Sequence, residues 1–260
     1  MARTVGQGAL VCALVCGLAA ACGAQNSDTW LRVGAGVDQS AIRNPAESPY
    51  RYGGEGVALS AAFGVTRSRS EFVVSLDGST ASMHSVISQS GTPHSALTAG
   101  GADFQYVWSP NARDGAIGWR FGVDVQARAE DDRHTYAVRY NSTNDYGYAF
   151  AVIGPLVRTG IRLPNGTLTN GLTMPLAGWI DCPYSNRSAN GSSVDVAFAV
   201  PPRLSVLDDA IRYRVGAPTS FGVSYVYRFS FVRYVLGDAR ISVRQSLLVV
   251  AEIPLSGRTP

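Results

Sequence analysis

The feature that most constrains this fold is GWRFGVDVQARAE, residues 118–130, in which apolar and polar side chains alternate. Trp119 and Phe121 fall on one side of an extended chain, and Arg120 and Asp124 fall on the other. Alternation with a period of two predicts a β-strand with two unlike faces. In a soluble β-sandwich the apolar face is the core, whereas in a membrane barrel it meets lipid and the charged face lines the lumen. Fold and function both depend on which face is inside.

Similar alternation recurs along the chain and predicts an all-β protein. We expect ten strands, at 30–38, 55–66, 69–79, 99–109, 116–128, 134–153, 168–180, 193–206, 211–231 and 239–252. Most are longer than the average globular strand of about 5–6 residues, and crossing a bilayer takes about 9–11 tilted residues. The length of these strands favours an antiparallel transmembrane β-barrel.

The strand count is open to revision because the stretch 155–218 is rich in proline. It carries seven prolines, among them Pro175 and the pair Pro201-Pro202. Proline removes a hydrogen-bond donor from a sheet and is confined to edges, strand starts and bulges. Eight or twelve strands are therefore also compatible with the sequence, and one or two segments here could fold inward as a plug.

The connections between the expected strands differ in length. Stretches 39–54 and 83–98 are predicted to be long loops, whereas 66–69 and 110–115 are predicted to be tight turns. Long extracellular loops and short periplasmic turns are typical of outer-membrane barrels.

Trp108 and Trp119 flank the short PNARDG turn at 110–115. Tryptophan is enriched where the bilayer meets water, so both are predicted to lie outward at the periplasmic interface. The alternative is a pair of core tryptophans beside a hairpin.

The first residues predict export. Arg3 precedes an apolar run at 8–21, followed by small residues, which is typical of a signal peptide over residues 1–24. Residues 25–260 would then form the barrel domain in the bacterial outer membrane. Cys22 follows three alanines, which leaves lipidation of Cys22 open as an alternative.

The inward phase of the strands carries charges of both signs. Such groups are tolerated inside a barrel when they pair with one another or with water. We expect them either to line a narrow solute path and set its selectivity or to close the lumen through ion pairs. The candidates are Arg120, Asp124, Gln126 and Arg128 of the opening stretch, together with Asp103, Arg228 and Arg244.

The residue pattern gives little indication of catalysis. The three histidines lack further ligands at metal spacing, and no hydrolase, phosphate-binding or CxxC motif occurs, so neither a metal, nor another cofactor, nor an enzymatic activity is expected. AEDDRH at 129–134 places acids and a histidine at what is predicted to be a hairpin tip. The net charge of +3 is too small to indicate nucleic acid as a partner.

The chain as a whole resembles small bacterial outer-membrane β-barrels. TWLRVGAGVD at 29–38 is similar to the opening strand of the OmpW family, which implies a small barrel associated with the passage of small hydrophobic compounds. The first hypothesis is a porin-like passive channel for small solutes or small hydrophobic molecules. The alternative is a closed barrel that binds host or envelope proteins through its long loops. A rim protease of the omptin class and a soluble secreted β-sandwich are less favoured.

Overall fold

The structure is a computed structural model, and it describes most of the chain beyond the expected signal segment. The described residues are 28–43, 51–85, 94–110, 117–135, 143–181, 196–216, 221–236 and 238–255. The predicted signal peptide and Cys22 lie outside them.

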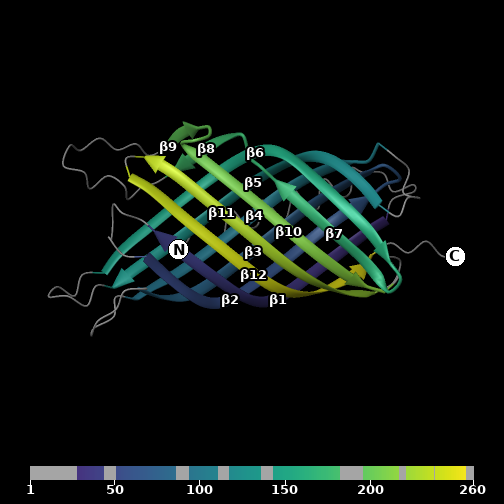
Figure 1. The fold of residues 1–260 in the computed structure, drawn as a ribbon, viewed down its shortest axis with the longest axis horizontal. Helices are drawn as coiled ribbons and strands as arrows, with labels where there is room; N and C mark the ends of the chain where they lie inside the picture. Colours follow the sequence, from purple (N-terminus) through teal and green to yellow (C-terminus); the bar gives the residue numbers. More distant parts are fainter. Residues whose placement is uncertain are drawn as a thin grey trace.

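The described residues form one sheet of antiparallel strands wrapped into a barrel (Figure 1). The strands are β1 (Asp28–Arg43), β2 (Arg51–Thr66), β3 (Ser70–Ser85), β4 (His94–Trp108), β5 (Ile117–Thr135), β6 (Thr143–Leu163), β7 (Gly166–Thr173), β8 (Ala177–Asp181), β9 (Val196–Ala199), β10 (Leu204–Val215), β11 (Gly222–Leu236) and β12 (Asp238–Pro254). Each pairs with its neighbour along the chain or across a short interruption, β1 pairs with β12, and β5 pairs with β6. These pairings close the ring through β7.

Twelve strand segments occupy ten positions in the wall. Residues 156–163 of β6 pair with β7 and residues 149–153 of β6 pair with β8, so β7 and β8 are two halves of one position. In the same way β9 pairs with β8 and β10 pairs with β7. The prediction of a closed antiparallel barrel of ten strands is confirmed.

The proline-rich stretch forms part of the wall, as the strands expected at 168–180 and 193–206 indicated, and its described residues form no plug. Pro175 lies in the interruption between β7 and β8, where the amides of Met174 and Leu176 still donate to Pro155 and Ile153 of β6. One strand therefore continues past a proline through a bulge, a place where the lost donor is tolerated. Residues 200–203, which include the proline pair, separate β9 from β10 by a turn in which the amide of Arg203 donates to the carbonyl of Val200. The expected single strand at 211–231 is wrong, because it divides into β10 and β11.

The strands are also longer than predicted at the end of the barrel opposite Asp28 and Pro254, here called the upper end. β1 and β2 leave only 44–50 between them, and β3 and β4 leave only 86–93, so about half of each predicted loop, at 39–54 and at 83–98, is strand. The connections alternate in length only in part. Residue 237 alone joins β11 to β12 at the upper end, and the lower connection between β4 and β5 spans 109–116.

The apolar face of the alternating stretch lies outside. Trp119 is 54% exposed and Phe121 is 48% exposed, whereas Asp124 and Gln126 are 0% and 1% exposed. Trp108, at the lower end of β4, is 45% exposed and faces outward as well. An apolar exterior around a polar interior is the arrangement expected of a wall that faces lipid. None of the described residues forms a helix long and apolar enough to cross a membrane.

Candidate functional site: the barrel lumen

The lower lumen is organised around two glutamates, of which Glu252 on β12 is the first. Its carboxylate accepts from Arg32 on β1 at 2.5 Å, from Arg214 on β10 at 3.1 Å, and from Arg212. The guanidinium of Arg32 also lies 3.4 Å from the ring centre of Trp30, a buried inward residue. Three strands are thus tied together by one carboxylate.

Glu71 on β3 is the second glutamate. Arg120 of β5 and Arg158 of β6 both donate to its Oε2 at 2.7 Å, and Arg158 also donates to Gln105 at 2.7 Å. Glu71 is 5% exposed, so this network is largely removed from water. Arg120, predicted as a lumen residue, is one of its members.

The middle of the lumen centres on Arg128 of β5. Its guanidinium lies 3.7 Å from Asp77 on β3, 3.4 Å from Asp103 on β4 and 3.7 Å from Asp208 on β10. Asp77 on β3 and Asp208 on β10 stand five positions apart in the ring of ten, so Arg128 bridges opposite walls. The structure therefore brings together two predicted candidates, Arg128 and Asp103, with two acids from other strands.

Asp124 and Gln126 form a second group at this level. The Oδ2 of Asp124 accepts from Gln126 at 2.9 Å, from Thr173 at 3.0 Å and from Gln105 at 3.5 Å. The two predicted candidates are therefore hydrogen-bonded to each other.

The last two candidates lie on the opposite part of the wall. Arg244 of β12 donates to Ser79 at 2.7 Å and lies 3.8 Å from Asp38. Arg228 lies half-buried in the inward phase of β11, paired in register with Ala210 and Ser246. The seven candidates are therefore spread over several networks rather than gathered at one point.

The upper lumen holds an ion cluster that sequence reasoning missed. Arg240 of β12, 1% exposed, lies 3.6 Å from Glu130 and 3.8 Å from Asp132, both on β5. The hydroxyl of Ser95 donates to Asp132, and the hydroxyl of Ser242 donates to Glu130 at 3.4 Å. Since β5 and β12 stand five positions apart in a ring of ten, these contacts join opposite walls.

The cluster also corrects the prediction for AEDDRH at 129–134. This stretch is not a hairpin tip, because β5 continues to Thr135. Glu130 and Asp132 point inward and are buried, while Asp131 between them is exposed. The alternation simply continues beyond the apolar exterior, and polar residues on both faces resemble a turn in sequence.

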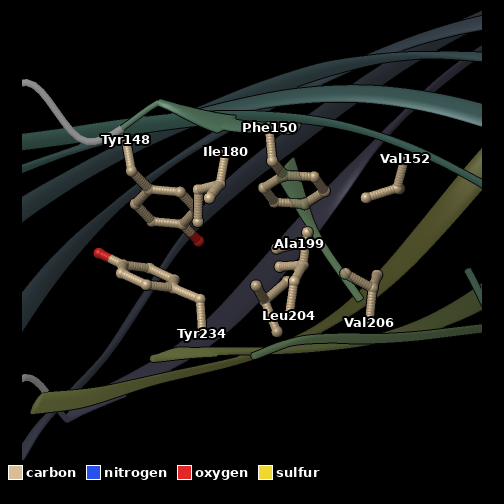
Figure 2. Packing of buried hydrophobic residues seen from close by; sticks show 9 residues of the cluster. Tyr148, Phe150, Val152, Ile180, Ala199, Leu204, Val206 and Tyr234 are labelled. Carbon is tan, nitrogen blue, oxygen red and sulfur yellow. The ribbon is translucent and has the colours of Figure 1, made fainter. Parts of the chain in front are cut away.

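Beside the ion cluster the upper lumen is filled by apolar side chains (Figure 2). The rings of Tyr148 and Tyr234 lie 5.1 Å apart, and the guanidinium of Arg240 lies 4.5 Å from the ring centre of Tyr148. The sequence gives a weak indication of this core, because on β6 the inward Phe150 is large and its outward neighbours are alanines. The cluster consists of Tyr148, Phe150, Val152, Ile180, Ala199, Leu204, Val206, Val232 and Tyr234.

No metal centre is found among the described residues, which contain no group of three or more histidines, cysteines or acids placed to hold an ion. His84 and His94 pair in register on the exposed face of β3 and β4.

No protein-family model and no curated protein matches the chain. Among solved structures it is similar to the outer membrane protease OmpT from Escherichia coli, with a TM-score of 0.51 and 8% identity over 88% of this chain and 96% of that chain. It is also similar to the translocator domain of the autotransporter NalP from Neisseria meningitidis, with a TM-score of 0.47 and 9% identity over 96% and 97% of the two chains. Ail, the attachment invasion locus protein of Yersinia pestis, gives a TM-score of 0.34 and 9% identity over 88% of this chain and 100% of that chain.

The similarity to OmpT, together with the closed antiparallel ring, establishes a fold class. The chain has the fold of the small bacterial outer-membrane β-barrels. At such low identity the similarities show the fold alone, and the resemblance of residues 29–38 to the OmpW family remains a prediction.

Proposed function

We propose that this protein is a closed outer-membrane barrel that works as a binding or interaction protein through its outer end. The observation that carries this proposal is the contact between opposite walls: Arg240 and Ser242 of β12 reach Glu130 of β5. This observation favours a closed barrel over an open porin-like channel.

The bore of a ten-stranded barrel is narrow, and here side chains occupy it at several levels. A barrel of about eight strands has an interior that side chains can just fill. Arg128 and Asp208 meet across the middle, and Met83 and Leu97 are both 0% exposed near the upper end. A hydrated path for solutes would have to displace paired charges and packed apolar groups together.

The upper rim supports a role in binding. Above the apolar exterior the outward positions change to charged and imidazole side chains that are accessible to a partner. They are Arg43, Arg51, Glu55, His84, His94, Asp131 and Arg133. Positive and negative groups that alternate over a rim are suited to a polar macromolecular partner rather than to lipid.

Electrical recording tests the closed lumen. The purified, folded protein in a planar lipid bilayer is expected to give no stable conductance steps. The positive control is an open porin inserted into the same bilayer, which is expected to give such steps. Steady single-channel currents from the unmodified protein would contradict the proposal.

A binding assay tests the outer end. Cells that display the protein are compared for adhesion to host extracellular matrix with cells that display a rim variant, Arg43→Ser, Arg51→Ser and Arg133→Ser. Adhesion is expected to fall in the variant at equal surface amount. Adhesion by the variant equal to that of the unmodified protein would count against the rim as the binding surface.

A further inference from the structure

The lower lumen holds more positive charge than the acids described there balance. Five arginines contact two glutamates in this region, so three positive charges remain. At the mouth of the barrel Asp28 and Arg162, both exposed in the inward phase of their strands, offset each other. The five arginines, here called the lower arginine group, are Arg32, Arg120, Arg158, Arg212 and Arg214, and their acceptors are Glu71 and Glu252.

The lower arginine group converges on one region of the lumen. Within each of the two glutamate networks, two guanidiniums donate to the same carboxylate oxygen. The charge of Glu71 also acts on Arg32 and Arg212, which belong to the network of Glu252. Guanidinium groups from β1, β5, β6 and β10 therefore share one space and repel one another across it.

The two glutamates do not satisfy this group on their own. The group carries about 25 N–H donors, whereas two carboxylates offer about eight lone-pair sites. Water satisfies spare donors but does not neutralise charge, and unbalanced charge in a poorly hydrated interior costs free energy. A bound anion would lower that cost.

Water reaches the lower arginine group through the lower opening. The side chains of Arg120, Arg32 and Arg158 are 30%, 21% and 19% exposed, although all three point into the lumen. In the upper lumen the side chain of Arg240 is only 2% exposed, beside the packed apolar cluster (Figure 2). Solvent thus enters the lumen from below and stops short of the upper end, which makes the lower lumen a blind vestibule.

The next level of the lumen has the opposite balance of charge. Arg128 there lies among three acids, Asp77, Asp103 and Asp208. An anion attracted to the lower arginine group is repelled by this acidic level, so it is held below the acids rather than passed upward. The order of charges along the lumen fits a binding site better than a path.

We propose that the lower arginine group is a binding site for a small oxyanion, a phosphate or carboxylate compound with two or three negative charges. The excess positive charge matches the charge of such a ligand, and the planar guanidinium donates in pairs to phosphate and carboxylate oxygens. Arg32 is held in place in advance, because its guanidinium lies 3.4 Å from the ring centre of the buried Trp30. Such preorganisation lowers the cost of ordering the site on binding. The site is separate from the outer rim, so it does not depend on the proposed function.

Isothermal titration calorimetry on the purified, folded protein tests this site. The probes are inorganic pyrophosphate and citrate, titrated separately at about 0.15 M sodium chloride, so that chloride screens any weak attraction of anions. We expect saturable binding of one anion per chain. Binding of either probe supports the site, and the tighter of the two identifies whether it prefers phosphate or carboxylate groups.

Two variants locate the bound anion, one in each network. Arg32→Gln leaves Glu252 with two arginines, and Arg120→Gln leaves the other glutamate with one. Both barrels are therefore expected to remain folded, which heat-modifiable gel mobility checks. Each variant is expected to weaken anion binding about tenfold or more, because one hydrogen bond to a charged group is lost.

The matched control is Arg51→Gln, which removes the same charge from the exposed face of β2 at the upper rim. Its affinity for both probes is expected to equal that of the unmodified protein. No saturable binding of either anion, unchanged affinity in both folded variants, or an equal loss in Arg51→Gln would overturn the proposal.

Discussion

The lower and upper halves of the lumen are both closed, but by different interactions. In the lower half, Glu71 and Glu252 accept hydrogen bonds from five arginines, with distances of 2.5 to 3.1 Å for those to Arg32, Arg120, Arg158 and Arg214. In the upper half, Arg240 lies 3.6 and 3.8 Å from its acids, and its Nε, Nη1 and Nη2 have no hydrogen-bond partner among the described residues. Aromatic and aliphatic packing fills the space around it.

The difference indicates two sources of stability in one barrel. A buried ion pair stabilises a fold only when its geometry is good and its remaining groups are hydrogen-bonded. The lower half meets that condition, so its charges should be hard to remove singly. The upper half does not, so its stability should come mainly from apolar packing.

The largest effect is expected in the lower half. Glu252→Ala leaves Arg32, Arg212 and Arg214 close together without their acceptor, and the free energy of unfolding is expected to fall by about 3–5 kcal/mol. Urea unfolding in phospholipid vesicles, followed by tryptophan fluorescence, measures the change. Glu55→Ala removes an exposed outward acid and should change it by less than about 0.5 kcal/mol. A loss in Glu252→Ala as small as that of its control would end the distinction between the two halves.

The next effect is expected from packing in the upper half. Leu204→Ala opens a cavity among the rings shown in Figure 2 and should lower the free energy of unfolding by about 3 kcal/mol. Leu207 lies three residues on, faces outward and is the matched control, because lipid fills the space that its truncation leaves. We expect Leu207→Ala to cost about 1 kcal/mol or less. Equal losses in the two variants would show that the upper lumen is not a packed core.

A smaller effect is expected when the whole upper ion cluster is replaced. The triple variant Arg240→Met, Glu130→Gln and Asp132→Asn keeps acceptors for Ser95 and Ser242 and removes all three charges. Replacing a poorly hydrogen-bonded buried cluster is often neutral, so the free energy of unfolding should change by about 1 kcal/mol or less. The single variant Arg240→Met should be worse than the triple, since it leaves two acids without their cation. The opposite order would mean that Arg240 contributes little to holding these acids.

The two halves also differ in how far sequence could predict them. The sequence predicted that Arg120, Asp124 and Arg128 point into the lumen, because alternation is a property of a few adjacent residues. Their partners were not, since Arg120 meets Glu71 only after the strands pair in register and the ring closes. Arg240 was missed altogether. Its acids, Glu130 and Asp132, lie on the opposite wall and lie within a polar stretch that resembles a hairpin tip.

The smallest effect is expected at the interruption that made the strand count uncertain. Pro175 lies between β7 and β8, where Met174 and Leu176 supply the donors to β6 on either side. Its missing N–H is therefore not needed, and Pro175→Ala should change the free energy of unfolding by less than about 0.5 kcal/mol. Pro175→Ala is compared with Val152→Pro, which puts a proline inside a continuous part of β6 and should prevent folding, as judged by gel mobility. If Pro175→Ala proved as damaging, the interruption would be a required bend of the wall rather than a tolerated bulge beside the upper packed core.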